Sequence, residues 1–236
     1  MELPFSNIWM ASQLSSRIPP ESRIYLGILN SLRSWNFFEV DNSIYAYSNT
    51  GGFGIDGAIS TTLGASLTNH NKLFYCVTGD LGFFYDMNAC GNRYFGNNVR
   101  ILLVNNGVGT EFCNYMHSAH SFGEDAHDYI AARGHYGSKS RDLVKHYAED
   151  LGFTYLSANN KEEFLENMKE FINPIIGDRS IIFEVFTDSE DESKALFMMH
   201  HLITERKTLI KRKVQNIGKK VLSEKNSEIV RDILGV

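Results

Sequence analysis

Short, continuously apolar runs alternate with amphipathic stretches along most of the chain. Two of these runs are residues 73–77 (LFYCV) and residues 99–104 (VRILLV), and polar turns separate them from stretches that are typical of helices. A strand that is apolar on both faces must be covered on both faces, and a parallel sheet between two layers of helices provides that cover. The sequence therefore predicts an α/β fold with a doubly wound, mostly parallel sheet and helices on both of its faces.

The expected element boundaries follow from where each run begins and ends. The sequence predicts strands over residues 23–28, 43–47, 73–77, 99–104, 153–156 and 180–185, and helices over residues 3–15, 31–38, 58–68, 81–91, 140–151 and 160–172. Residues 108–138 show no clear period, and we expect them to form a long loop over the active site. A set of short, packed helices is the alternative. Ordinary connections are only about 4–6 residues long, so this length indicates a functional segment.

The composition excludes several classes of protein. Of the 236 residues, 43% are hydrophobic and 22% are charged, which is globular composition. The net charge of −5 argues against a nucleic-acid partner, and no apolar run is long enough to span a membrane. The opening MELPFSNIWMASQ lacks the basic start and apolar block of a secretory signal, so we expect a cytoplasmic protein. Three widely spaced cysteines form neither a disulfide framework nor a zinc site, which agrees with a reducing compartment.

Charge is unevenly distributed along the chain. Lysine and arginine are concentrated from Ile203 onward, whereas the part of the chain before that residue is acidic. We therefore predict one domain over residues 1–203. Residues 204–236 are expected to form a basic, helical tail outside the sheet domain.

Gly79 and Asp80 stand between an apolar strand and a helix, at the carboxyl end of the strand. Open α/β sheets bind ligands at these strand ends. Glycine lets a ligand approach the backbone closely, and the first N–H groups of the next helix suit a phosphate. A carboxylate beside a phosphate is repulsive unless a divalent cation lies between them, so Asp80 indicates Mg²⁺. Taken alone, Asp80 is more simply interpreted as the N-cap of the helix.

Asn105 and Asn106 follow the next strand along the chain. An amide oxygen is a hard, neutral ligand that suits Mg²⁺ or Ca²⁺, although Asn-Gly is also a common turn sequence. Asn97 and Asn98 form a competing pair. Because they precede the strand, we expect them at the opposite edge of the sheet from Asp80.

The combination is more specific than its parts. Residues 79–112, GDLGFFYDMNACGNRYFGNNVRILLVNNGVGTEF, resemble the thiamine-diphosphate motif of thiamine-dependent enzymes. In that family the Gly-Asp aspartate and the second asparagine hold Mg²⁺ together with a backbone carbonyl two residues later, and the metal anchors the diphosphate. Carried over by position, the resemblance implies thiamine diphosphate and Mg²⁺ as cofactors. The implied metal ligands are Asp80, Asn106 and the carbonyl of Val108.

A second segment, residues 47–64 (YSNTGGFGIDGAISTTLG), resembles the loop and helix that support the rings of the cofactor in this family. Ile55 falls where the family has a bulky apolar residue that holds the cofactor in its bent form. The carbonyl of Phe53 would face the 4′-amino group of the cofactor. The cofactor-binding residues that the resemblance implies are Asn30, Ser31, Phe53, Gly54, Ile55, Gly79, Asp80, Leu81, Gly82, Asn106, Val108 and Gly109.

Within the superfamily, the chain is most similar to the menaquinone-pathway synthases, which join a decarboxylated 2-oxoglutarate to isochorismate. The similarity extends over nearly all of residues 4–200 and includes residues 54–57 (GIDG) and 184–188 (EVFTD). Two positions depart from the synthase pattern. Thr50 replaces an arginine that binds a substrate carboxylate, and Glu111-Phe112 replaces an apolar pair.

Thiamine-dependent enzymes combine two α/β domains, and this chain resembles only the one that binds the diphosphate. The resemblance implies a pyrimidine-binding domain as partner, on the same longer chain or on a separate subunit, and a homo-oligomeric enzyme. The cofactor site of the family lies at a domain interface, so we expect an apolar, partner-facing surface. The residues expected in that surface are Phe53, Phe83, Phe84, Tyr85 and Met87.

The implied activity is decarboxylation of a 2-oxo acid or carboligation, with the cofactor as electron sink. Candidates for proton transfer or carboxylate binding are Glu111, His117 and His120. The alternative is a non-catalytic phosphate- or nucleotide-binding module on the same fold, because fold alone does not determine function. The chain carries neither a GxxxxGK[ST] nor a strand-linked GxGxxG motif, which weakens other phosphate-binding interpretations.

Overall fold

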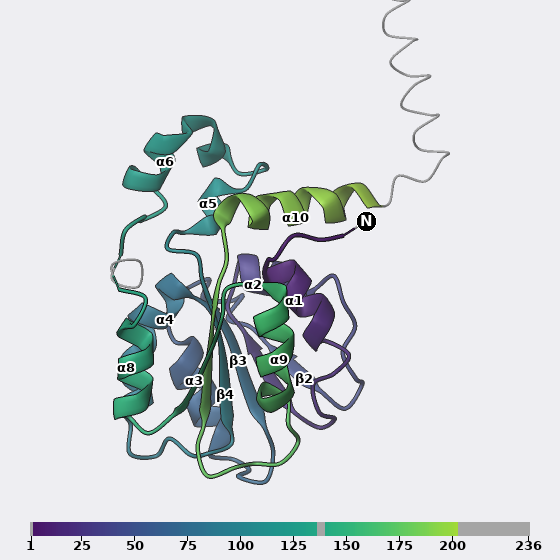
Figure 1. Cartoon of the computed structure of the whole chain (residues 1–236), viewed down its shortest axis with the longest axis vertical. Coiled ribbons are helices and arrows are strands. Elements are labelled where there is room, and N and C mark those ends of the chain that lie inside the picture. Colours follow the sequence, from purple (N-terminus) through teal and green to yellow (C-terminus); the bar gives the residue numbers. More distant parts are fainter. Residues whose placement is uncertain (1, 136–139, 203–236) are drawn as a thin grey trace, which may run out of the picture. The chain divides into compact units, whose positions relative to one another are not determined.

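A computed structural model of the chain describes residues 2–135 and 140–202. It contains a six-stranded sheet in which every neighbouring pair of strands is parallel, in the order β2-β1-β3-β4-β6-β5 (Figure 1). The predicted doubly wound α/β sheet is therefore confirmed. The strands are β1 (Arg23–Leu26), β2 (Tyr45–Tyr47), β3 (Phe74–Gly79), β4 (Val99–Asn105), β5 (Thr154–Ala158) and β6 (Ile181–Phe186).

The six predicted helices are present in the expected order, with ends that differ by a few residues, whereas the helix over Ser189–Leu202 was not predicted. The segment after β4 is not irregular: up to residue 135 it contains three short helices, as in the alternative above, and residues 136–138 lie outside the described part. The helices are α1 (Asn7–Leu14), α2 (Asn30–Trp35), α3 (Ala58–Ser66), α4 (Asp80–Asp86), α5 (Thr110–Cys113), α6 (Glu124–Tyr129), α8 (Leu143–Asp150), α9 (Lys161–Phe171) and α10 (Ser189–Leu202), with 3₁₀ helices η1 (Met87–Gly91) and η2 (Ser118–Phe122).

Side chains on each strand alternate between two cores, one on each face of the sheet. On one face, Leu102 and Phe183 of the strands join a cluster with Trp9, Trp35 and Phe164 of α1, α2 and α9. The rings of Phe164 and Phe183 stack with centroids 5.1 Å apart. This arrangement explains why β4 and β6 are apolar at nearly every position: each needs apolar side chains for both faces.

The second core contains Ile101 and Leu103 of β4 and is covered by α3, α4 and α8 (Figure 1). Phe83 of α4 belongs to it and has no exposed surface, so its predicted place in an exposed apolar surface is wrong. Helical periodicity is the reason, because Phe83 faces the sheet while Tyr85, two residues later, faces outward and is 68% exposed. Phe53 is also exposed, as expected.

The strand order places a switch point between β1 and β3. From β1 the chain goes to β2 on one side, and then crosses to β3 on the other side. The connections that leave β1 and β3 therefore run in opposite directions, which leaves a crevice at the carboxyl ends of these strands. Asn98 lies before β4 at the opposite edge, where its Nδ2 donates to backbone carbonyls of Ser66, Asn69 and Lys72. The competing Asn97-Asn98 pair therefore lies where the sequence predicted it.

Residue contacts divide the chain into Met1–Phe197 and Met198–Val236. The sheet and the cavities discussed below belong to the first unit. Of the second unit, only residues 198–202 at the end of α10 are described, so the predicted basic tail over residues 204–236 lies outside the described residues. Across residues 2–135 and 140–202, no helix has the length and apolar character needed to cross a membrane.

Candidate active site

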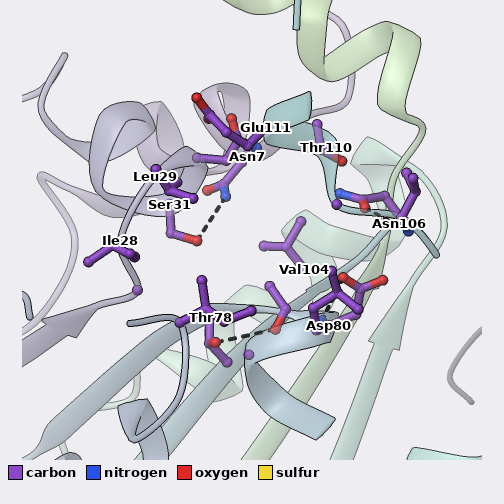
Figure 2. Close-up of a pocket in the computed structure, with 18 of the residues that line it drawn as sticks. Asn7, Ile28, Leu29, Ser31, Thr78, Asp80, Val104, Asn106, Thr110 and Glu111 are labelled. Carbon is purple, nitrogen blue, oxygen red and sulfur yellow. Dashed lines mark hydrogen bonds between the residues drawn. The ribbon is translucent and has the colours of Figure 1, made fainter. Parts of the chain in front are cut away.

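A cavity of about 170 Å³ opens at the switch point, at the carboxyl ends of β1, β3 and β4. Figure 2 shows Asp80 and Asn106 at one side of it and Asn7 and Ser31 at the other. Most of the predicted site residues line this cavity. They are Asn30, Ser31, Ile55, Gly79, Asp80, Leu81, Gly82, Asn106, Val108, Gly109 and Glu111.

The Asp80 carboxylate is held in place by backbone donors of two loops. Its Oδ1 accepts the Leu81 N–H at 2.9 Å, and its Oδ2 accepts the Gly107 N–H at 2.7 Å. Only 3% of the residue is exposed. Since Gly107 follows β4, the carboxylate joins the ends of two neighbouring strands. An N-cap side chain instead bonds the second or third N–H of its own helix, so the N-cap interpretation does not describe Asp80.

His135 also contacts this carboxylate. Its Nε2 lies 2.9 Å from Asp80 Oδ2, and its ring packs against Phe84 with centroids 5.5 Å apart. The pair is almost fully buried. His135 therefore contacts the same carboxylate oxygen that accepts the Gly107 N–H.

The two asparagines after β4 have different environments. Asn105 is buried and its Nδ2 donates to Glu184 Oε1 at 2.7 Å, whereas Asn106 lines the cavity. Glu184 also accepts the hydroxyl of Tyr155 at 2.7 Å. Burial raises the pKa of the Glu184 carboxyl, and the bonds from Asn105 and Tyr155 act in the opposite direction. Of the pair, Asn106 is thus the one available to a ligand.

Gly82 allows the loop that carries Ile55 to reach the cavity. A Cβ atom at Gly82 would lie 2.8 Å from the Ile55 carbonyl oxygen and 2.8 Å from Thr78 Oγ1. No real side chain tolerates contacts that short, so the close approach of this loop to α4 requires glycine. Asn49 shapes the same loop, because its Oδ1 accepts the Gly52 N–H at 3.1 Å.

The opposite wall of the cavity consists of uncharged polar groups from α1 and α2. Asn7 Nδ2 donates to Ser31 Oγ at 3.3 Å, and Asn30 lies beside Ser31 in sequence. Leu29, which precedes them, has a φ of +66°, an unusual conformation for a residue with a side chain. Such backbone strain costs about 1–3 kcal/mol and is concentrated at functional sites.

Glu111 of α5 also lines the cavity, next to these uncharged groups, and forms an ion pair there. Both of its oxygens bond Arg33 of α2, at 2.6 and 2.8 Å, and Glu111 thereby raises the pKa of the guanidinium. Two parallel bonds of this kind are the strongest geometry for such a pair. Arg33 therefore engages both oxygens of Glu111, and a proton-transfer role for Glu111 remains a prediction.

We expect only a modest contribution of this pair to stability. The Arg33 side chain is 32% exposed and the Glu111 side chain 15%, so solvent screens their attraction. A double-mutant cycle with Arg33→Gln and Glu111→Gln should give a coupling of about 0.5–1 kcal/mol in urea unfolding. A coupling near zero would contradict the geometry. The exposed pair of Arg133 and Glu124 is the matched control, with a smaller coupling expected.

Four predicted residues do not line this cavity. Phe53 is exposed on the loop before α3, and Gly54 follows it. His117 accepts the Ala119 N–H at 3.1 Å and thereby caps η2. His120 lines a different cavity, of about 440 Å³, between α5, α6 and α10. The structure therefore does not bring His117 or His120 together with Asp80, and their catalytic roles stay predictions.

The family model for the C-terminal TPP-binding domain of thiamine pyrophosphate enzymes matches residues 30–185. This range includes Asp80, Asn106 and Ile55 and covers well over half of the chain. The chain belongs to this family. Thiamine pyrophosphate is the same compound as thiamine diphosphate, so the predicted resemblance is confirmed.

The relatives of this TPP-binding domain include the synthases named above. The 2-succinyl-5-enolpyruvyl-6-hydroxy-3-cyclohexene-1-carboxylate synthase of Bacteroides fragilis is 32% identical over 200 residues, which are 85% of this chain and 34% of that protein. The synthase of Bacteroides thetaiotaomicron is 30% identical over 205 residues, with shares of 87% and 35%. The chain thus spans about a third of the length of these relatives.

A solved structure shows the same fold. It is the Rhodococcus jostii RHA1 thiamine diphosphate-dependent 4-hydroxybenzoylformate decarboxylase, with a TM-score of 0.59 and 18% sequence identity. The match covers 80% of this chain and 33% of that one. At this identity the likeness concerns the fold, and it agrees with a TPP-binding α/β domain.

The cavity of this TPP-binding domain fits a polar ligand. Asn7 Oδ1 and Thr110 Oγ1 are buried at its wall and have no hydrogen-bond partner in the part of the chain that the structure describes. Buried polar atoms are nearly always paired. The Thr110 hydroxyl could donate to a ligand oxygen, whereas Asn7 Oδ1 can only accept and would need a bridging water. At the other side, Gly79 leaves space beside Asp80, since a Cβ atom there would meet only the Val104 carbonyl oxygen, at 4.0 Å.

Sequence reasoning missed several residues around the cavity. Asn7 lies on a helix that is far away in sequence, and a single asparagine in a helix carries no local signal. Arg33 and His135 can be recognised as site residues only from their contacts with Glu111 and Asp80, which appear in the folded structure. The arginine in NSLRSW, just after the predicted Asn30 and Ser31, was the available signal for the ion pair.

Proposed function

We propose that this chain is the diphosphate-binding part of a thiamine diphosphate-dependent 2-oxo acid decarboxylase or carboligase. The observation that carries the proposal is the placement of Asp80 and Asn106 at neighbouring strand ends, across the cavity from Asn7 and Ser31. Thiamine diphosphate supplies an electron sink for the carbanion that decarboxylation leaves. The residues of this chain bind and orient the cofactor and exclude water around it.

Mg²⁺ would be held by Asp80, Asn106 and the Val108 carbonyl. Within residues 2–135 and 140–202, no group of three or more His, Cys, Asp or Glu side chains is arranged to hold a metal ion. A single carboxylate with an amide and a carbonyl is a weak site by itself, and it agrees with Mg²⁺ that binds mainly together with phosphate groups. The metal and the diphosphate should therefore bind as one unit.

A pyrimidine-binding domain is the proposed partner, because the chain spans about a third of its curated relatives. Exposed Phe53 and Tyr85, on the loop before α3 and on α4, are candidates for contact with it. A homo-oligomeric assembly and a cytoplasmic location are further predictions. Both partner arrangements, a longer chain and a separate subunit, are compatible with this proposal.

Titration calorimetry on the 236-residue chain tests this proposal. Thiamine diphosphate should bind with Mg²⁺ and lose its binding in excess EDTA, because the metal links the diphosphate to Asp80. ADP with Mg²⁺ is the matched comparison, since it carries a diphosphate without the thiamine rings. Equal binding of both ligands would favour the phosphate- or nucleotide-binding module instead. A chain that binds neither, alone or with a pyrimidine-binding domain, would refute the assignment.

A further inference from the structure

Glu192 is a buried carboxyl group directly behind the uncharged wall of the cavity. It lies in the first turn of α10 and is 1% exposed. Its Oε1 accepts the Asn7 backbone N–H and the Thr187 hydroxyl, both at 2.9 Å. Its Oε2 accepts Asn30 Nδ2 at 3.2 Å. One side chain therefore connects α1, α2 and the segment after β6.

The hydrogen bonds of the Glu192 carboxyl determine which donor groups of the wall are available to a ligand. Asn30 has one of its amide hydrogens committed to Glu192. Asn7 is anchored through its backbone, and its side chain donates to Ser31 Oγ at 3.3 Å. A hydroxyl oxygen that accepts from Asn7 keeps its own hydrogen for another partner. The Ser31 O–H is thus left to donate into the cavity, toward an acceptor such as a phosphate oxygen.

We infer that Glu192 is a positioning residue for an anion-binding wall made of Asn7, Asn30 and Ser31. It acts through these residues and does not itself line the cavity. The group that the wall takes is a phosphate, and its identification with the diphosphate of the cofactor rests on the proposed function. Partners that orient metal-ligating side chains typically change affinity by about 10–100-fold when they are removed, and we expect a loss of similar size for this wall.

The surroundings of Glu192 place its titration in a pH range that can be measured. Burial raises its pKa to about 7, while the bonds from Asn7, Thr187 and Asn30 act in the opposite direction. These groups, from α1, α2 and the segment after β6, are uncharged. Among the described residues, the charged neighbour that acts on it is Asp191 of its own helix, which raises the pKa further. A titration near neutral pH is accessible without unfolding the chain.

The first experiment follows side-chain amide resonances of ¹⁵N-asparagine-labelled full chain between pH 5 and pH 9. The Asn30 amide should shift with a single midpoint near pH 7, because its acceptor changes charge there. Glu192→Gln should abolish this titration, since glutamine keeps the volume and stays neutral. Glu190→Gln, an exposed neighbour in the same turn, should leave it intact. If the Asn30 amide titrated in the Glu192→Gln variant as it does in the wild type, the inference would be overturned.

A second experiment repeats the titration with Mg²⁺ and thiamine diphosphate. An anionic diphosphate at the wall should raise the midpoint, because it disfavours the ionised carboxyl. Glu192→Ala should weaken cofactor binding by about tenfold or more, and Glu192→Gln should restore most of it. If the titration depends on Glu192 but its midpoint does not change when the cofactor is added, Glu192 positions the wall, and the diphosphate of the cofactor is not the ligand of that wall. Equal affinities of wild type and Glu192→Ala would overturn the positioning role.

Discussion

Replacement of Asp80 by alanine should abolish Mg²⁺-dependent binding of thiamine diphosphate. The variant loses the carboxylate that would hold the metal and the acceptor of the Leu81 and Gly107 N–H groups. Since loss of an outer-shell partner already costs about 10–100-fold in metal affinity, loss of the ligand itself should cost at least about 100-fold. Titration calorimetry with the cofactor at saturating Mg²⁺ measures the difference.

Two further variants make this result interpretable. Asp80→Asn removes the charge at nearly constant volume and keeps an acceptor oxygen for one of the two backbone N–H groups, so it should disturb the fold less than alanine does and still fail to bind. Asp150→Asn, on the exposed end of α8, removes an equal charge far from the cavity and should bind as the wild type does. Unchanged affinity in Asp80→Ala would mean that the metal lies elsewhere.

Gly82→Val should destabilise the fold and displace Ile55. The added Cβ would lie 2.8 Å from the Ile55 carbonyl oxygen, and backbone cannot yield as a flexible side chain does. Overpacking of this kind costs about 1–3 kcal/mol, and the β-branched side chain adds strain in α4. Urea unfolding followed by circular dichroism measures the loss.

Gly64→Ala is the matched control for this prediction. Gly64 lies in the interior of α3, and a Cβ there would meet nothing within 4 Å. Alanine in an exposed helix position is more favourable than glycine by about 0.5–1 kcal/mol, so this variant should be more stable than the wild type. If Gly82→Val were as stable as the wild type or more stable, the close approach of the Ile55 loop to α4 would be disproved.

The sheet could be predicted from the sequence because each strand is recognised from the residues within its own apolar run. Residues 73–77 and 99–104 are apolar at every position but Arg100, and Pro19-Pro20 limits the first helix. Arg100 is buried all the same, because its guanidinium donates to four carbonyl oxygens, two in the last turn of α9 and two in the loop that follows it. The Gly-Asp and Asn-Asn spacing likewise predicted two neighbouring strand ends, since parallel order follows from the alternation of strands and helices.

The rest of the site depends on contacts between residues that are distant in sequence. Glu192 is one acid in the run SEDES, and only the packing of α10 distinguishes it from its exposed neighbour Glu190. The short helices after β4 were missed as elements because α5 has four residues, too few for a helical period to show. Phe83 was misplaced for a different reason: adjacent aromatic residues in FFY point to different sides of a helix.

The pairing of β3 with β4 fixes the distance between the two proposed metal ligands. Gly79 lies opposite Val104 in this parallel ladder, so Asp80 and Asn106 leave the sheet one and two residues beyond that pair. A slip by a single residue would turn the side chains of one strand to the wrong face and separate the two ligands. A ligand that bridges Asp80 and Asn106 therefore binds only one register. By mass action, such a ligand stabilises that register by RT ln(1 + [L]/Kd), where [L] is its free concentration, so its binding would report correct strand alignment.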